Sequence, residues 1–245
     1  MKHEGNSARV ERSADTRTRI LAAALSEFAA NGFAGARTQR IAAAADVNKA
    51  LLYYYFESKE KLYQVTRELC AGRIRGGLMA VYVGEGTPGE RILRTALNHF
   101  DRTMGQQEAQ VLFQQEILRL HKKESHSTPL IAKRMFASMV TLFRVLVRQG
   151  IASGELIPVD WMQMQLSTLG ANIFYFLSEP LWRKVLPLDP PDAEVLRKRR
   201  EHLVRFLGQT IFTDRQHGAK LAERVLTESP MPEIPGSRPD MGRSL

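Results

Sequence analysis

The stretch that most constrains this chain is TQRIAAAADVNKALLYYYFESK, which runs from Thr38 to Lys59. Its apolar positions fall at helical spacing and are Ile41, Ala42 and Ala45, followed by Leu52 and Phe56. This spacing predicts two short amphipathic helices. The residues Asp46 to Asn48 can turn the chain between them, because Asp and Asn tolerate left-handed backbone angles and cap helices with their side-chain oxygens. We therefore predict a helix-turn-helix, with Lys59 opening a further helix.

The second helix of such a motif can enter the major groove of DNA. Of three consecutive tyrosines, Tyr53 to Tyr55, at least one must face outward, because successive residues of a helix point about 100° apart. For any single tyrosine, a core position with a solvent-exposed hydroxyl is as good an interpretation as a DNA contact. Taken together with the neighbouring polar side chains, they predict contact with DNA. We expect base contacts from Lys49, Ala50, Leu51 and Tyr53, phosphate contacts from Thr38, Arg40, Tyr55 and Lys59, and either kind from Gln39 and Tyr54.

The segment NKALLYYYFESKEKLY resembles the recognition-helix segment of the tetracycline-repressor (TetR/AcrR) family, in which a turn precedes Leu-Tyr-x-Tyr/His-Phe and then x-Ser/Asn-Lys. The resemblance continues upstream through Arg19-Ile20-Leu21, Phe28, Gly32-Phe33, Thr38 and Ile41-Ala42. The chain departs from the family at Asp46, where Gly is usual and Asp costs some strain. It also departs at Leu51, where a small or hydroxyl residue is common and Leu can make only an apolar contact, such as with a thymine methyl.

The resemblance implies an all-α fold, with an N-terminal three-helix DNA-binding domain and a larger helical domain for ligand binding and dimerisation. It also implies a two-fold homodimer, built through a four-helix bundle of the last two long helices, on a palindromic operator of double-stranded DNA. A small-molecule inducer would release the protein from that operator. Repression is the family's usual mode.

Composition agrees with such a protein and argues against a disulfide-bonded, secreted or membrane-spanning one. The 245 residues are 44% hydrophobic and 25% charged, as in ordinary soluble proteins, and the net charge of +9 suits an anionic partner. The single cysteine, Cys70, cannot form an intramolecular disulfide, and its place on an apolar stripe predicts a packing residue. We find no signal-peptide pattern and no apolar run of membrane-spanning length, so we expect a cytoplasmic protein without a membrane partner.

We predict a disordered arm over residues 1–14, a DNA-binding domain over 15–60, a helical body over 61–227 and a disordered tail over 228–245. Arg9 and Arg12 either reach a minor groove or belong to a solvated tail. About nine helices are expected. Those outside the helix-turn-helix are predicted at about 15–31, from 59 after a Ser58 cap, from Pro88, around 111–121, from Pro129 to Gly150, from the Asp160 cap to Ser178, and at 192–212, with loops at 121–128 and 181–191.

The sequence GEGTPG, residues 84–89, matches a dinucleotide-binding pattern after the apolar run LMAVYV. An enzyme with a nicotinamide or flavin cofactor is therefore the competing hypothesis. No second strand pattern follows at the required distance, and Pro88 fits the first turn of a helix better than a phosphate loop. No catalytic triad or paired carboxylates are legible either. We predict a loop, no cofactor and no enzyme activity. A helical protein-interaction module without DNA specificity is a third reading.

The body offers two further sets of candidates. The helix after Asp160 is apolar almost all round, which predicts either a central position in one subunit or a dimer interface. The predicted interface residues are Leu166, Leu169, Ile173, Phe174, Leu177, Leu203, Phe206 and Leu207. A second set of aromatic and methionine side chains could line a ligand pocket, and the alternative is that each is an ordinary core residue. These residues are Phe100, Met104, Phe113, Met135, Phe136, Met139, Phe143, Met164 and Tyr175. We predict no metal site, because His99, His121 and His126 lack the spacing of one.

Overall fold

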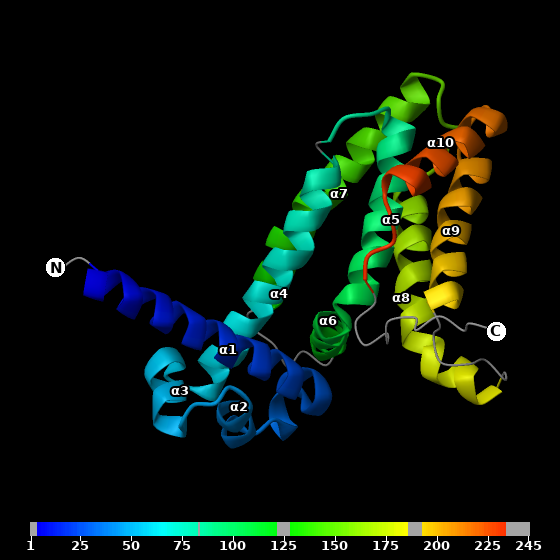
Figure 1. The fold of residues 1–245 in the computed structure, drawn as a ribbon. Coiled ribbons are helices and arrows are strands. Elements are labelled where there is room, and N and C mark those ends of the chain that lie inside the picture. Colours follow the sequence, from blue (N-terminus) through cyan, green and yellow to red (C-terminus); the bar gives the residue numbers. More distant parts are fainter. Residues whose placement is uncertain (1–3, 83, 122–127, 186–192, 234–245) are drawn as a thin grey trace, which may run out of the picture. The chain divides into compact units, whose positions relative to one another are not determined.

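The computed structural model describes residues 4–82, 84–121, 128–185 and 193–233. These ranges are helical apart from turns and an isolated antiparallel bridge between Leu156 and Phe212. In chain order (Figure 1), the helices are α1 Glu4–Gly35, α2 Thr38–Ala44, α3 Lys49–Phe56, α4 Lys59–Tyr82, α5 Pro88–Gly105, α6 Gln107–His121, α7 Thr128–Ala152, α8 Trp161–Val185, α9 Ala193–Thr210 and α10 Arg215–Glu228. The predicted all-α class is confirmed, with ten helices in the described ranges where about nine were expected.

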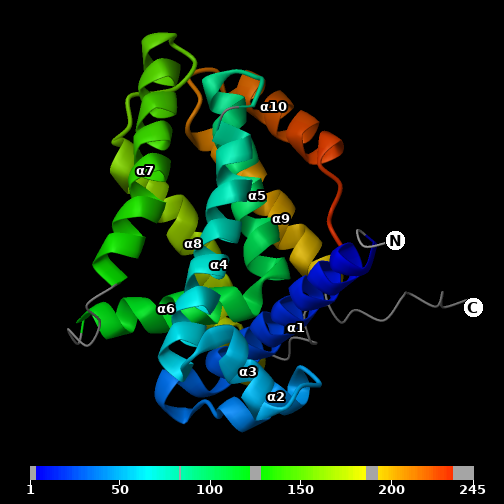
Figure 2. The same ribbon diagram turned by 90° about the vertical axis from the view of Figure 1, so that its left-hand side faces the viewer.

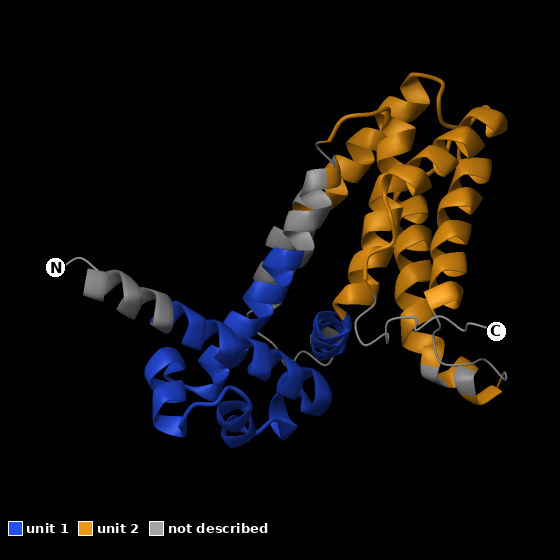
Figure 3. Cartoon of the chain, viewed as in Figure 1, with its two compact units in different colours: residues 1–73, 107–133 blue, residues 74–106, 134–245 orange. Residues whose placement is uncertain are grey.

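The chain divides into two compact units (Figure 3). Unit 1 comprises residues 1–73 and 107–133, and unit 2 comprises residues 74–106 and 134–245. Unit 1 therefore holds α1, α2, α3 and α6, whereas the predicted division between residues 60 and 61 assigned α6 to the second domain. Helices α4 and α7 contribute residues to both units.

Unit 1 has its own apolar core, in which α1 lies against α2 and α6, and α2 lies against α3 (Figure 2). Its largest fully buried side chains are Ile20, Phe28, Ile41, Leu52, Phe56 and Leu62. Helix α6 is fastened to this core by polar contacts as well. The Tyr63 hydroxyl donates to Glu116 Oε1 at 2.5 Å, and Arg67 Nη1 lies 2.5 Å from Glu116 Oε2. Burial, followed by the Glu116 contact, raises the pKa of Tyr63 to about 12, so its hydroxyl stays protonated.

Gly32 interrupts α1 where the sequence predicted a helix end. Its backbone angles, φ 65° and ψ 176°, lie in a region that is essentially restricted to glycine. The helix beyond Gly32 is short and ends at Gly35. The break turns the chain toward α2.

Three predicted helix starts are confirmed by hydrogen bonds. Ser58 Oγ accepts from the Lys61 N–H at 3.0 Å, and Thr87, just before Pro88, accepts from the Glu90 N–H at 3.2 Å. Asp160 Oδ1 accepts from two N–H groups of the first turn of α8, at 2.8 and 2.9 Å. Such caps satisfy N–H groups that have no partner within the helix, and they depend on local sequence alone.

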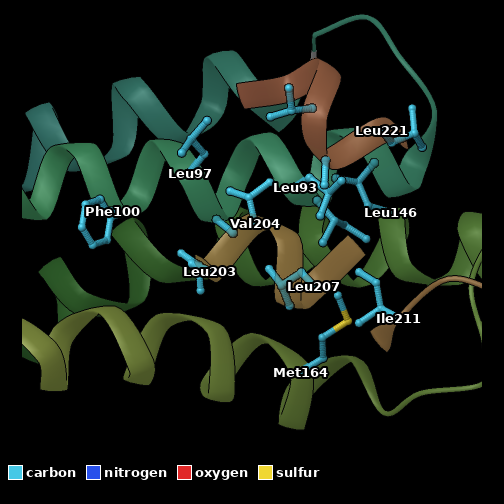
Figure 4. Packing of buried hydrophobic residues seen from close by; sticks show 14 of the residues in the cluster. Leu93, Leu97, Phe100, Leu146, Met164, Leu203, Val204, Leu207, Ile211 and Leu221 are labelled. Carbon is cyan, nitrogen blue, oxygen red and sulfur yellow. The ribbon is translucent and has the colours of Figure 1, made fainter. Parts of the chain in front are cut away.

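The core of unit 2 is built where α5 packs against α8, α9 and α10 (Figure 4). Its fully buried members include Ile92, Leu93, Phe100, Val204 and Phe212. Helix α10 crosses α9 at a glycine pair, because a Cβ atom on Gly218 would overlap the carbonyl oxygen of Gly208. This close approach lets Leu221 and Val225 reach the core.

Several predicted boundaries are wrong. Helix α1 begins at Glu4 rather than Asp15, and the helix is continuous there, since Thr18 Oγ1 donates to the Ala14 carbonyl at 2.9 Å. Helix α8 runs past Ser178 to Val185, held by a hydrogen bond from Trp182 Nε1 to Ser178 Oγ at 2.8 Å. Helix α10 was not predicted as a separate element. The predicted loop at 122–127, residues 186–191 of the predicted connection and the tail from residue 234 lie outside the described residues.

Cys70 is buried in the core of unit 1, as a packing residue should be. Burial raises the pKa of its thiol to about 11, so the thiol remains protonated. Within the described ranges, we find no helix that combines the length and the hydropathy needed to span a bilayer.

Candidate nucleic-acid interface

The turn between α2 and α3 is held by backbone and side-chain hydrogen bonds. Asn48 caps α3 by accepting from the Leu51 N–H at 2.7 Å, and the Val47 N–H donates to the Ala42 carbonyl at 3.0 Å. Asp46 takes φ 52°, the left-handed angle that its place in the turn predicted. Arg19 of α1 donates to the Ala45 carbonyl at 2.8 Å and so ties the turn to the first helix.

The two short helices separate apolar from polar side chains as the sequence predicted. The five apolar positions of the motif are buried: Ile41, Ala42, Ala45, Leu52 and Phe56. The exposed candidates are Gln39, Arg40, Lys49, Ala50, Leu51 and Tyr54. Tyr54 is 79% exposed, so one tyrosine of the three does face fully outward. An exposed tyrosine ring can stack on a sugar or base, and its hydroxyl can donate a hydrogen bond.

The other two tyrosines are half-buried, with their hydroxyls hydrogen-bonded. The Tyr53 hydroxyl lies 3.2 Å from Thr38 Oγ1, and Lys49 Nζ lies 5.7 Å from the centroid of the Tyr53 ring. The Tyr55 hydroxyl donates to Ser13 Oγ of α1 at 3.1 Å. These contacts fix the orientation of α3 relative to α1 and α2.

Lys59 has a structural contact besides its predicted role. Its Nζ donates to the Ala34 carbonyl at 3.4 Å and lies 5.0 Å from the centroid of the Phe33 ring. Arg37 was not among the predicted contact residues. It is exposed immediately before α2, and its backbone N–H donates to Glu27 Oε1 at 2.9 Å. A cation directly before the first helix of the motif was the available signal.

The turn after α3 has unusual backbone geometry. Glu57 takes φ 62° and ψ −50°, and the Ser58 N–H donates to the Phe56 carbonyl at 2.6 Å. A hydrogen bond across three residues with these angles is the rare, strained form of the γ-turn. Together with Asp46, Glu57 gives α3 a strained non-glycine residue at each end. Such strain persists where the surrounding structure enforces it, commonly at functional sites.

The predicted pocket residues are partly brought together. Phe100, Met104, Met139, Phe143 and Met164 belong to the core of unit 2, and Tyr175 packs against them. Phe113 instead lies on α6 in unit 1. The side chains of Met135 and Phe136 fall outside the described part of the structure.

The predicted interface residues separate into two groups. Leu166, Phe174, Leu177 and Phe206 are exposed, and Leu169 and Ile173 are half-buried. Leu203 and Leu207 are only 4% and 5% exposed and belong to the unit 2 core, so their assignment to an intersubunit surface is wrong. They face inward because α9 packs that stripe against α5.

The GEGTPG segment has the geometry of a helix start. The run before it, LMAVYV, is helical through Tyr82, and not a strand. Thr87 caps α5 and Pro88 occupies its first turn. Glu155 accepts from Thr87 Oγ1 at 2.5 Å and from the Gly89 N–H at 2.9 Å, so a carboxylate already lies where a phosphate would bind. The strand–glycine–helix order of a dinucleotide site is therefore not met here.

Comparison with known proteins follows the same segment. Residues 20–66 match the sequence model of "Bacterial regulatory proteins, tetR family", and they comprise α1 from its first fully buried residue through α2, α3 and the first turns of α4. The fold is shared with the crystal structure of AibR in complex with isovaleryl coenzyme A and operator DNA, at a TM-score of 0.62 and 19% identity over 80% of this chain and 97% of AibR. Residues 20–66 thus carry the sequence pattern of the tetR family. The resemblance noted in the sequence is thereby confirmed.

Curated relatives match part of the chain. The HTH-type transcriptional repressor SCO4008 of Streptomyces coelicolor is 52% identical over 48 residues, which are 20% of this chain and 25% of the relative. The HTH-type transcriptional repressor NicS of Pseudomonas putida is 40% identical over 63 residues, 26% of this chain and 30% of the relative. The matched segments thus span between a quarter and a third of these relatives.

Proposed function

We propose that this chain is a dimeric, sequence-specific DNA-binding regulator that acts as a repressor and leaves a palindromic operator when a small molecule binds. The observation that carries the proposal is α3, a short helix with a buried apolar side and an outward face of Lys49, Ala50, Leu51 and Tyr54. The match of residues 20–66 to the tetR-family model and the similarity of part of the chain to named repressors support it. Binding to chromosomal DNA would place the protein in the cytoplasm.

In this proposal the exposed side chains divide the work of recognition. Lys49, Ala50 and Leu51 lie on the first turn of α3, which is the part of a recognition helix that contacts base edges. Arg40 of α2 supplies a cation for the phosphate backbone, and Arg37 joins it. Tyr53 contributes less directly than the sequence analysis expected, because its hydroxyl is already bonded to Thr38.

The proposed dimer uses an exposed apolar stripe on α8, formed by Leu166, Phe174 and Leu177, together with Phe206 of α9. Large apolar side chains on this stripe are between half and two-thirds exposed, with Phe174 at 61%. A stripe of this kind on a soluble protein is a candidate association surface. Gly170 lies within the stripe, and a Cβ atom at this position would meet no neighbour within 4 Å, which leaves room for a second helix to approach closely. Two heads on a two-fold axis would read two half-sites and multiply the affinity.

The proposed inducer would bind in unit 2, among α5, α7 and α8. Binding can release DNA only if the ligand prefers one conformation of the protein over the other, since equal affinity for both shifts no equilibrium. The two-unit construction, with α4 and α7 continuing from one unit to the other, supplies covalent connections through which such a preference could reach the DNA-binding helices.

A gel-shift titration tests the proposal, with DNA taken from upstream of the protein's own gene and a scrambled duplex as competitor. The wild-type protein should bind the upstream DNA specifically, and the affinity should fall steeply with salt because phosphate contacts release counterions. Tyr54→Ala and Arg40→Ala should each weaken binding at least about tenfold. Lys220→Ala, which removes an exposed cation from α10, should leave it unchanged. Equal affinity for the upstream and scrambled duplexes would instead support a helical interaction module.

A further inference from the structure

The interior of unit 2 contains a polar seam between α5 and α8. The buried polar side chains of these two packed helices include Thr95, His99 and Thr103 of α5 and Gln165, Thr168 and Asn172 of α8. Helices that bury their facing sides usually fill them with apolar side chains, because a polar group inside a protein is costly unless it is hydrogen-bonded. Each polar group of this seam therefore needs a hydrogen-bond partner inside the protein.

The threonines are satisfied within their own helices. Thr95 Oγ1 donates to the Arg91 carbonyl at 2.7 Å, Thr103 Oγ1 to the His99 carbonyl at 2.7 Å, and Thr168 Oγ1 to the Met164 carbonyl at 2.9 Å. Hydroxyls bonded in this way behave as compact, nearly apolar side chains. They do not require a partner across the seam.

Asn172 differs from the threonines. It is 0% exposed, and its Nδ2 donates to the Ala96 carbonyl at 3.3 Å and to His99 Nδ1 at 3.1 Å. A backbone carbonyl can only accept, so the Ala96 contact fixes which end of the amide is the nitrogen. Asn172 Oδ1 then has no hydrogen-bond partner within the described structure, although it is fully buried.

His99 is the complementary member of the pair. Because its Nδ1 accepts from Asn172, its Nε2 carries the hydrogen of the neutral ring. Burial lowers the pKa of His99 to about 4, so the ring is uncharged at neutral pH. The pair thus presents an unused acceptor, Asn172 Oδ1, beside a neutral imidazole donor.

The same two helices also bring aromatic rings together. The Phe100 ring centroid lies 6.2 Å from that of Tyr175 and 5.2 Å from that of Phe176. Phe100 follows His99 in α5, and Tyr175 lies three residues after Asn172 in α8, so the aromatic rings and the polar pair lie within one turn of each other along the two packed helices. A few placed polar groups within an apolar and aromatic lining are what small-molecule sites in proteins have in common.

We propose that Asn172 and His99 are the polar recognition pair for the ligand of this regulator, and that the ligand is an uncharged molecule with an N–H or O–H group and an apolar or aromatic body. The inference rests on the proposed function, because it names the ligand chemistry of the site proposed there. The ligand N–H or O–H donates to Asn172 Oδ1, and the N–H of the His99 ring donates to an acceptor atom of the ligand. The apolar or aromatic body of the ligand packs beside Phe100 and Tyr175. An anionic ligand is excluded by the same geometry, since a carboxylate has no donor for Oδ1.

Three probes of one ring size test the proposal: benzamide, benzoate and toluene. Saturation-transfer NMR titrations at pH 7.5 on the full chain give the dissociation constant of each. Benzamide should bind at least about tenfold more tightly than toluene or benzoate, because a site with a buried unpaired acceptor favours the probe that can pair with it. Asn172→Leu should abolish that preference while toluene still binds. Thr168→Val, which changes a neighbouring hydroxyl already bonded to its own helix, should keep it.

Three results would overturn the proposal. Benzamide could bind no better than toluene, as expected if a water molecule alone satisfies Oδ1. The preference could survive in Asn172→Leu. Benzoate could bind as tightly as benzamide, which would assign recognition to a cation such as Arg199, whose guanidinium lies 5.3 Å from the Tyr175 ring centroid. If Asn172→Leu does not fold by circular dichroism, the wild-type preference decides, since benzamide and toluene share the ring.

The same preparations separate this inference from the proposed function. A gel shift without any probe reports on DNA binding alone, and the NMR titration contains no DNA. Loss of specific DNA binding with benzamide preference intact would overturn the regulator assignment only. Specific DNA binding without a benzamide preference would overturn the recognition pair only.

Discussion

The hydroxyl of Thr38, the first residue of α2, lies 3.2 Å from the hydroxyl of Tyr53 in the middle of α3. This contact joins the two helices of the motif at their outer surface, whereas the apolar contacts join them from within. It therefore sets the angle at which α3 is presented, independently of core packing.

The first prediction concerns this hydrogen bond. Thr38→Val and Tyr53→Phe should each lower the free energy of unfolding by about 0.5–1.5 kcal/mol, and the double variant should lose little more than either single one, because the two hydroxyls serve one bond. Urea denaturation followed by circular dichroism measures all three. Tyr54→Phe, which removes an exposed hydroxyl, is the control and should change nothing. Additive losses would mean that the two hydroxyls do not interact.

The second prediction concerns the strained turn after α3. Glu57 holds φ 62°, which costs an L-residue about 1–3 kcal/mol but glycine very little. Glu57→Gly should raise the free energy of unfolding by about 1 kcal/mol, the relief of strain being partly offset by the greater freedom of glycine in the unfolded chain. Glu57→Ala removes the same charge but keeps the strain, so it should show no gain in a urea titration. An equal gain in both variants would attribute the effect to charge.

Local sequence predicted the motif well, because its signals are local. The caps at Ser58 and Asp160, the helix start at Pro88 and the buried positions of α2 and α3 each depend on residues within one or two turns. An outward-facing tyrosine among Tyr53 to Tyr55 could be predicted for the same reason, since three adjacent helical residues cannot share one side.

Long-range partners were not predictable in this way. The polar side of α6 pairs with α1 inside unit 1, where Gln115 Nε2 donates to the Ala29 carbonyl across 86 positions of sequence at 2.9 Å. Leu203, Leu207 and Phe206 all read as apolar positions of α9, yet only Phe206 is exposed. An apolar pattern shows that a residue is buried against something, and packing alone decides whether that is its own chain or a second copy.

The third prediction tests the proposed second copy. Phe174→Glu should convert a dimer to a monomer, raising the dissociation constant at least about 100-fold, because two copies of an unpaired charge would have to enter an apolar interface. Sedimentation velocity over a concentration series measures the change. Thr227→Glu adds the same charge at an exposed position of α10 and should leave the dimer intact. A wild-type protein that is monomeric at micromolar concentration would contradict the proposed interface.

The fourth prediction concerns pH and the buried ring of His99. Burial lowers its pKa from 6.5 to about 4, so in acid the unfolded chain binds a proton that the folded chain refuses. The stability that the neutral His99 ring contributes is therefore fully present above pH 6.5. It is lost as the pH falls from 6.5 toward 4, and at pH 5 about 2 kcal/mol of the free energy of unfolding is gone. His99→Gln should lose correspondingly less free energy of unfolding than the wild type between pH 7.5 and pH 5, by urea denaturation at each pH. His202→Gln changes an exposed histidine of α9 and should follow the wild-type curve. Parallel curves for wild type and His99→Gln would mean that folding does not change the pKa of His99, so that the ring would be protonated at pH 5 and could not accept from Asn172 there.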